Sequence, residues 1–245
     1  MLGLAGCVSY NAATGHNEMI LISTSSEVSM GRKAHQQIAC KERILPDRNP
    51  EVERLRNIGK RLVRFSDRQD YQYQFFMIDK DELNAFTIPG GYIYFYTGLF
   101  RKLPSDDAIA AVLAHEIGHC AARHTVKKMQ GSMGYDVARN VVVNILAFKV
   151  PQASLVTSLG ARGADSVMGL AMTAYSRHDE YEADRLGIKY LYLAGFDLNG
   201  MIQTFDVLAK ADQKGGAPLF LRTHPFVKDR LVAVKKEMED VKKKF

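Results

Sequence analysis

Apolar residues recur at intervals of three and four along most of the chain, the spacing of helices that bury one face. Two tyrosine-rich segments, Tyr71–Ile78 and Tyr92–Thr97, instead predict strands, and Pro89-Gly90-Gly91 between them predicts a turn. The pattern therefore predicts an α+β fold that is mainly helical, with a small antiparallel sheet. The predicted helices cover Glu27–Arg43, Glu51–Phe65, Ala108–Met129, Asp136–Phe148, Ser166–Ala194, Asn199–Ala211 and Val227–Lys244.

The length of 245 residues, 47% of them hydrophobic, suits one sizeable core. We therefore expect a single domain over residues 27–245, after a weakly structured tether over residues 1–26. The formal charge of +6 is spread along the chain among acidic residues, which argues against a nucleic-acid-binding surface. The densest basic run is compatible with a solvated helix face or with contact to anionic lipid. It comprises Lys235, Lys236, Lys242, Lys243 and Lys244.

The N-terminal segment Leu4-Ala5-Gly6-Cys7 resembles the lipobox of bacterial lipoproteins, in which the cysteine is acylated after signal cleavage. A chance run of small residues before a cysteine is the alternative. The residues before Cys7 are too few for a whole secretory signal, so we interpret them as the shortened end of one. Acylation of Cys7 would place the protein in the periplasm, anchored to the outer membrane but not spanning it. The most apolar later segments, Val141–Phe148 and Val167–Ala174, are shorter than the ~18–20 residues that cross a bilayer.

The segment His115-Glu116-Ile117-Gly118-His119 lies inside a predicted helix that contains no proline. Residues four apart lie one turn above each other, so both imidazoles can reach one Zn²⁺ at ~2.0–2.1 Å. Glu116 lies ~100° round the helix from His115, near the metal without binding it. There it can act as the general base on water that zinc activates. The five-residue pattern also arises by chance, but its place in an apolar helix favours a metal site.

A catalytic zinc site needs a third protein ligand and an open position. On a helix, Glu180 and Asp184 share a face, so Glu180 can bind the metal while Asp184 accepts a hydrogen bond from a ligand histidine. Glu182 points ~160° away from Glu180 and is expected to be a solvated carboxylate. His178 is expected to be a surface or helix-end residue.

Further short segments follow one another as in a known family: Asn84-Ala85-Phe86-Thr87-Ile88-Pro89-Gly90-Gly91, Tyr96-Thr97-Gly98-Leu99, Ala122-Arg123-His124, Ser176-Arg177, Ala183-Asp184, Thr223-His224-Pro225 and Arg230. With the histidine motif they resemble the CAAX prenyl protease and HtpX family of zinc metallopeptidases, of the gluzincin type. The resemblance implies a zincin-like fold, one Zn²⁺ per chain and Glu180 as the third ligand. The membrane spans of those two branches are missing, so the chain resembles most the soluble, lipoprotein-type bacterial members that act in protein quality control.

The same resemblance implies a substrate-binding edge strand and a third histidine at the site. The edge strand would pair with an extended peptide through main-chain groups. We assign it Asn84, Ala85, Phe86, Gly90, Gly91 and Tyr92. His224 would either stabilise the oxyanion of the reaction or occupy the open position of the metal in a resting form. Arg230 would orient the loop of His224 or pair with an acid.

Two neighbours of the histidine motif have other expected roles. Arg123 and His124 should pack against or cap the helix, because position 124 lies ~140° from His119 on a continuous helix. Cys120 is turned ~100° from His119 and lies further from His115, so we do not expect it to bind the metal. Cys40 and Cys120 are left either as a disulfide or as two buried thiols, since Cys7 would be acylated.

These observations predict a zinc-dependent endopeptidase that hydrolyses peptide bonds of misfolded or envelope proteins. Glu116 would take the proton from the attacking water and pass it to the leaving amine. The alternative is a chaperone-like envelope assembly factor with a regulatory or closed zinc site. The expected partners are polypeptide substrates and envelope proteins, and the membrane only through Cys7.

Overall fold

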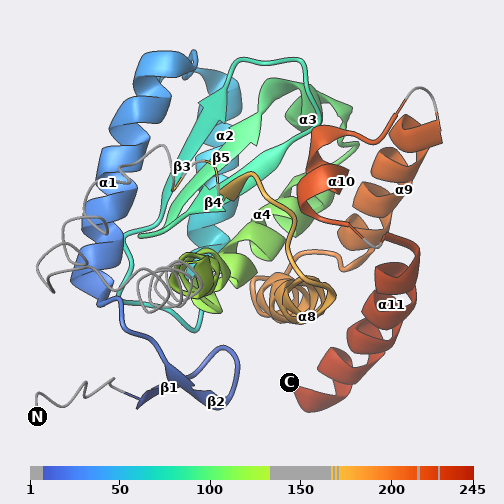
Figure 1. The fold of residues 1–245 in the computed structure, drawn as a ribbon. Helices are drawn as coiled ribbons and strands as arrows, with labels where there is room; N and C mark the ends of the chain where they lie inside the picture. The colour runs from blue at the N-terminus through green and yellow to red at the C-terminus, as the bar shows by residue number, and fades with distance from the viewer. Residues whose placement is uncertain (1–7, 133–166, 168, 170, 214–215, 226) are drawn as a thin grey trace, which may run out of the picture.

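The computed structural model describes residues 8–132, 167, 169, 171–213, 216–225 and 227–245. In these residues a small sheet is surrounded by helices (Figure 1). This arrangement confirms the predicted α+β class. The helices are α1 (Thr24–Lys41), α2 (Pro50–Val63), α3 (Thr97–Lys102), α4 (Asp106–Ala121), α8 (Arg177–Leu193), α9 (Asn199–Gln213), α10 (Leu219–Thr223) and α11 (Val227–Lys244).

The main sheet has three strands, β3 (Gln74–Ile78), β4 (Ala85–Ile88) and β5 (Tyr92–Tyr96), in the order β3-β5-β4. β4 runs antiparallel to β5, as the glycine turn between them requires, whereas β3 runs parallel to β5. The sheet is therefore mixed, not purely antiparallel. Tyr92 lies on the central strand, so its assignment to the substrate edge is wrong. The edge is β4.

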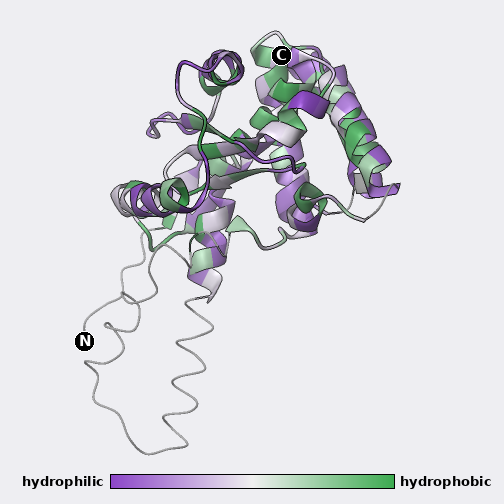
Figure 2. Cartoon of the chain, turned by 90° about the horizontal axis from the view of Figure 1, so that it is seen from above, coloured by the Kyte–Doolittle hydropathy of each residue, from purple (hydrophilic) through white to green (hydrophobic). Residues whose placement is uncertain are grey.

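The two faces of this sheet are covered by different helices. Ile93 and Phe95 of β5 share a buried cluster with residues of α2 and α4. The alternate residues Tyr92, Tyr94 and Tyr96 belong to a second cluster with α1. Strand residues point to opposite faces in turn, so one apolar strand joins both halves of the core. Figure 2 shows hydrophilic and hydrophobic residues alternating along the outer helices, as expected for helices that bury one face.

The helix α4 lies at the centre of the molecule and packs closely against α8 (Figure 1). A Cβ at Gly118 would lie 2.8 Å from the carbonyl oxygen of Ala183, and one at Gly187 would lie 3.1 Å from the backbone nitrogen of His115. Each helix thus has a glycine where the backbone of the other comes closest. This approach places the polar residues of α8 beside the histidine motif of α4.

Two predicted helices have different bounds in the structure. The helix expected over Ala108–Met129 ends at Ala121, and Arg123 has a φ of 60° before residues 124–132 are helical again. The helix expected over Ser166–Ala194 is interrupted: residues 167, 169 and 171 are helical, residues 172–176 are not, and α8 begins at Arg177. Ser176 caps α8 through a reciprocal pair of hydrogen bonds with Asp179. The expected helix over residues 136–148 lies outside the described residues.

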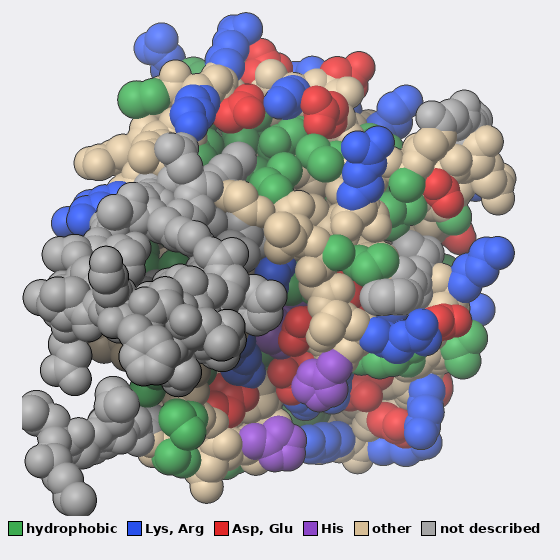
Figure 3. Space-filling model, viewed as in Figure 1, with side chains coloured by type: hydrophobic (Ala, Val, Ile, Leu, Met, Phe, Trp, Pro, Cys, Tyr) green, Lys and Arg blue, Asp and Glu red, His purple; other side chains and the backbone are tan. Residues whose placement is uncertain are grey.

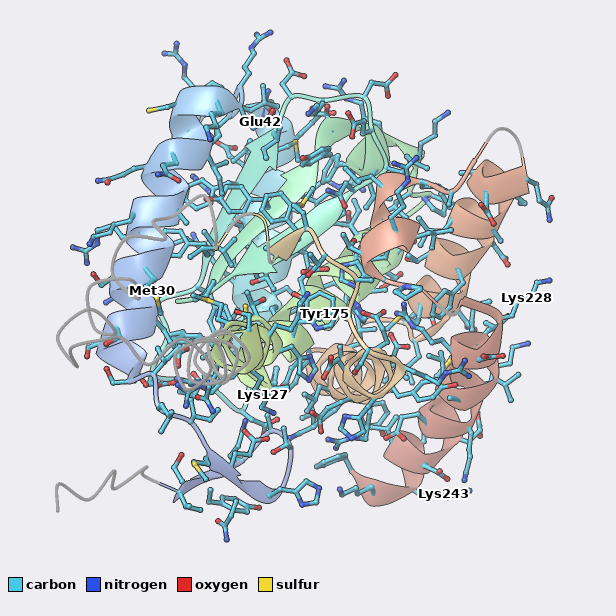
Figure 4. All side chains as sticks on the ribbon, viewed as in Figure 1. Met30, Glu42, Lys127, Tyr175, Lys228 and Lys243 are labelled. Carbon is cyan, nitrogen blue, oxygen red and sulfur yellow. The ribbon has the colours of Figure 1, made fainter. Side chains whose placement is uncertain are left out.

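The first described residues form a hairpin, where we expected a weakly structured stretch. β1 (Val8–Asn11) pairs antiparallel with β2 (His16–Met19). The hairpin is tied to the domain by Lys127, whose Nζ lies 2.5 Å from Glu18 (Lys127 is labelled in Figure 4). The expectation is therefore wrong for residues 8–19. Cys7 lies outside the described residues. Across the described part of the chain, no helix combines the length and apolarity needed to cross a membrane.

Candidate metal centre

Four buried side chains from three parts of the chain converge beside α4. His115 and His119 come from α4, Glu180 from the first turn of α8, and His224 from the end of α10. One ligand atom from each lies within 4.8 Å of all the others. The structure thus brings together the three predicted metal ligands and His224. Histidine, acidic and basic side chains gather over α8 on the face shown in Figure 3.

The spacing of these atoms suits a single ion. His115 Nε2 lies 3.0 Å from His119 Nε2 and 3.2 Å from His224 Nδ1. Glu180 Oε1 lies 3.0 Å from His224 Nδ1 and 3.3 Å from His119 Nε2. Ligands of a tetrahedral zinc at ~2.0–2.2 Å are separated by ~3.3–3.6 Å. Three imidazoles and one carboxylate are a donor set that Zn²⁺ accepts, so the residues fit the ion that the motif implies.

The protonation of these residues also suits a cation. Burial lowers the pKa of His115 and lowers that of His119 well below its ordinary value, so both rings are neutral. Burial alone would raise the pKa of Glu180, but Arg230 and His224 hold it well below the usual range. Neutral imidazoles and an ionised carboxylate are the forms that bind metal.

His115 is supported by an ion pair between α8 and α11. Its Nδ1 lies 2.9 Å from Asp184 Oδ1. Arg230 donates to both oxygens of that carboxylate, from Nε and from Nη2, at 2.7 Å each. The same guanidinium contacts Glu180 through Nη1 and donates from Nη1 to the carbonyl oxygen of His224 at 3.3 Å. Asp184 and Arg230 therefore lie where the sequence predicted, and Arg230 reaches both an acid and the loop of His224.

Glu116 is buried beside the four ligands and is not one of them. Within the described residues neither of its carboxylate oxygens has a hydrogen-bond partner, and Oε1 lies 3.4 Å from His224 Nε2. Burial raises the pKa of Glu116 to about 7, against the lowering effect of His224. A buried carboxylate without a partner is rare unless it has a chemical role. A pKa near neutrality is suited to a general base.

The structure gives His124 and Glu182 contacts that the sequence interpretation missed. His124 Nδ1 lies 2.7 Å from His119 Nδ1, and His124 Nε2 lies 3.2 Å from Glu182 Oε2. Position 124 would lie ~140° from His119 only on a continuous helix, whereas α4 ends at Ala121. Glu182 is therefore not simply solvated. His178 is exposed, as expected. The ring of Tyr175, just before α8 and labelled in Figure 4, stacks on His119 with centroids 3.9 Å apart.

The other predicted residues lie around this centre. Asn84, Ala85 and Phe86 lie at and before the start of the edge strand β4, and Gly90 and Gly91 form the turn into β5, both with positive φ. Cys40 is an exposed free thiol and Cys120 a buried one, so the disulfide is not formed. Cys120 Sγ contacts Thr87 Oγ1 at 2.7 Å instead of the metal ligands.

Comparison with known proteins gives a consistent result. The model of peptidase family M48 matches residues 49–238. The beta-barrel assembly-enhancing protease of Escherichia coli K12 is 32% identical over 186 residues, 72% of this chain and 37% of that protein. The mitochondrial metalloendopeptidase OMA1 of Schizosaccharomyces pombe is 28% identical over 214 residues, 86% of this chain and 60% of that protein. Metalloprotease LoiP of E. coli K12 is 27% identical over 217 residues, 89% of this chain and 82% of that protein. The chain thus spans little more than a third of the length of the assembly-enhancing protease.

Proposed function

The chain belongs to peptidase family M48, a family of metalloproteases, and from this premise we propose that it is a zinc-dependent endopeptidase. Its substrates would be misfolded or envelope polypeptides. The finer placement, among the lipoprotein-type members of the CAAX prenyl protease and HtpX group, is part of the same proposal. It rests on the Thr223-His224-Pro225 segment and the Asn84–Gly91 segment.

One observation carries the proposal. A group of two α4 histidines and Glu180 that could hold a metal lies beside Glu116, a buried carboxylate that has no hydrogen-bond partner in the part of the chain that the structure describes. His115, His119 and Glu180 would hold one Zn²⁺ per chain. Bound there, zinc supplies a Lewis acid that activates water and polarises the scissile carbonyl. Glu116 takes the proton from the attacking water and passes it to the leaving amine.

His224 has two available roles in this scheme. Its Nδ1 lies among the ligand atoms, and its Nε2 has no hydrogen-bond partner among the residues that are described. With zinc held by His115, His119 and Glu180, a ring in this position would take the place that a catalytic site keeps open. Such a position would suit a resting form, from which His224 would have to turn away for catalysis. We therefore expect His224→Ala to increase casein hydrolysis if the ring is inhibitory, and to decrease it if the ring stabilises the oxyanion.

The substrate would lie along the edge strand β4. Tyr96 N donates to Asn84 O at 3.0 Å, so alternate residues of β4 bond to β5. The backbone groups of the residues between, Ala85 and Thr87, point away from β5, although both residues are buried. Leu83 O faces the same side and accepts from Phe220 N at 2.9 Å. Among the described residues, no backbone group bonds to Ala85 or Thr87 on that side. These groups suit an extended peptide, with little regard for its sequence.

Pairing of this kind can be tested with competitor peptides methylated at one backbone nitrogen. Methylation removes a donor, so it should weaken inhibition at every second position of the peptide and leave the positions between unaffected. Equal sensitivity at all positions would contradict pairing with β4.

The closed set of four ligands also favours the second candidate function, an envelope assembly factor with a structural or regulatory zinc. Zinc content and casein hydrolysis separate the two, measured before and after treatment with a chelator and after zinc is restored. The endopeptidase proposal expects hydrolysis that is lost with zinc and returns with it. A protein that holds zinc and never hydrolyses casein, even as His224→Ala, would be the assembly factor.

We further propose that the protein is periplasmic and anchored to the outer membrane through Cys7. The support is the Leu4-Ala5-Gly6-Cys7 segment, together with the name of the E. coli relative, a beta-barrel assembly-enhancing protease. Mass spectrometry of the N-terminal peptide from envelope fractions tests the anchor. An acylated Cys7 that is lost together with membrane attachment in Cys7→Ser is the expected result, and an unmodified thiol is the contrary one.

A further inference from the structure

We propose that His124 is a positioning residue for the metal ligand His119, and that Glu182 holds His124 from the other side. The three side chains form a histidine-histidine-carboxylate chain that reaches from the metal group to α8. The inference rests on the proposed zinc site and adds to it two residues that do not bind the ion.

The position of His124 depends on the turn that follows α4. The helix ends at Ala121, and the positive φ of 60° at Arg123 redirects the chain so that residue 124 returns toward His119. A positive φ disfavours residues other than glycine, so this turn needs support from its surroundings. Arg123 supplies it by donating to the carbonyl oxygen of Ile22 at 2.6 Å and by contacting the buried carboxylate of Glu27.

The contacts fix which nitrogen of each ring carries the proton. His119 Nε2 faces the other ligands, 3.0 Å from His115 Nε2, so its lone pair must point to the metal and its proton lies on Nδ1. That proton is donated to His124 Nδ1 at 2.7 Å. The proton of His124 then lies on Nε2 and is donated to Glu182 Oε2 at 3.2 Å. Every donor in the chain therefore has an acceptor.

The turn also holds the face of the His119 ring. Thr125, the next residue, shares a hydrogen bond of 2.9 Å with the hydroxyl of Tyr175. The ring of Tyr175 stacks on His119 with an angle of 25° between the planes. His119 is thus fixed at its edge by His124 and across its face by a tyrosine that the same turn holds. Such support orients a ligand ring and raises its basicity.

The simpler interpretation is that His124 only fills space in a buried region. Packing alone does not require its two nitrogens to lie on the line between a metal ligand and a carboxylate. Asp179 Oδ1 also lies 3.6 Å from His124 Nε2, so two acidic side chains face the same nitrogen. This second carboxylate compensates in part for loss of Glu182, and His124 is therefore the better residue to test.

The test compares His124→Leu with His124→Asn in the full chain, by competition for zinc with a chromophoric chelator. Leucine removes the acceptor, whereas the amide oxygen of asparagine occupies the place of Nδ1 and still accepts from His119. We expect His124→Leu to weaken zinc binding by roughly 10–100-fold and His124→Asn by much less. The exposed His16 on β2 gives the matched control, His16→Leu, which should leave zinc binding unchanged.

Thermal unfolding of each variant in excess chelator separates folding from zinc binding. His124→Leu within twofold of the wild type, or a loss in His124→Asn equal to that in His124→Leu, would overturn the proposal. If His124→Leu does not fold, the pair Glu182→Leu and Glu182→Gln replaces it, with the larger loss of affinity expected for leucine and equal losses contradicting it. A wild-type protein that binds no zinc would refute the proposed function itself, whereas normal zinc binding by His124→Leu refutes only this inference.

Discussion

The two histidines of one helical turn are supported in opposite ways. His115 contacts Asp184, which is held by two hydrogen bonds from the buried Arg230 on α11. His119 contacts a second histidine, which comes from the turn directly after α4 and reaches Glu182. The first side is charged and joins distant segments of the chain. The second begins with a residue close in sequence, and the carboxylates of Glu182 and Asp179 lie at its far end.

The supports of His115 and His119 therefore have different roles. Asp184 and Arg230 are buried charges, and Arg230 also contacts Glu180 and the carbonyl oxygen of His224, so the pair holds α4, α8 and α11 together. His124 contacts Glu182, a carboxylate that is not fully buried, and its contact with His119 concerns the orientation of one ring. We therefore expect the His115 side to determine folding as well as zinc affinity, and the His119 side to determine mainly zinc affinity.

Loss of the ion pair that supports His115 should have the largest effect on stability. Arg230→Met leaves two carboxylates buried without their partner and should lower the free energy of unfolding by about 3–5 kcal/mol. Chemical denaturation of the zinc-free protein measures this change. Arg43→Met is the control, because Arg43 forms an ion pair of 3.0 Å with Asp79 while its own side chain is 79% exposed. Arg43→Met should lower the free energy of unfolding by less than about 1 kcal/mol, and an equal decrease in both variants would contradict the account.

A direct comparison of the two supports comes next. Asp184→Asn and His124→Leu should both weaken zinc binding by roughly 10–100-fold, since each removes the hydrogen-bond partner of one ligand. Only Asp184→Asn should also lower the stability of the zinc-free protein clearly, because it leaves Arg230 buried with less compensating charge. Chelator competition and denaturation of both variants test this. Equal losses of zinc-free stability would remove the distinction between the two sides.

The sequence predicts the support of His115 better than the support of His119, for a physical reason. Helical periodicity is enough to place His115 beside His119 and Glu180 beside Asp184, since each pair lies one turn apart within a continuous helix. His124 depends on a helix break at Arg123, which no strong breaker residue marks. The break is stabilised by contacts with Ile22 and Glu27, about a hundred positions earlier, and local patterns cannot show them.

The remaining differences also follow from contacts that local patterns do not contain. The parallel pairing of β3 with β5 depends on tertiary contacts. The tyrosine-rich segments could therefore predict two strands but not the order of the strands in the sheet. The hairpin over residues 8–19 is polar in sequence and is tied to the domain by contacts of Lys127 and Gln130. The start of α8, by contrast, is marked in the sequence by the capping box of Ser176 with Asp179.

The close packing of α4 against α8 affects the supports of both His115 and His119, and disturbing it should have the smallest effect on stability. Gly118→Ala would place a Cβ 2.8 Å from the carbonyl oxygen of Ala183, so the helices must move apart at a cost on the order of 1 kcal/mol. Gly131→Ala, where no atom lies within 4 Å, is the matched control and should be neutral or slightly stabilising. Thermal unfolding compares the two. A neutral Gly118→Ala with unchanged zinc affinity would show that this contact does not position the site.

The most direct test of the central claim is Glu116→Gln, measured for zinc content and for casein hydrolysis. Glutamine keeps the shape of the side chain but cannot take a proton, and Glu116 is not among the ligand group. The exposed Glu53→Gln on α2 is the control, with both properties unchanged. We predict that Glu116→Gln retains one zinc per chain and loses hydrolysis by at least about 10²-fold. Full hydrolysis by Glu116→Gln with zinc still bound would contradict the account.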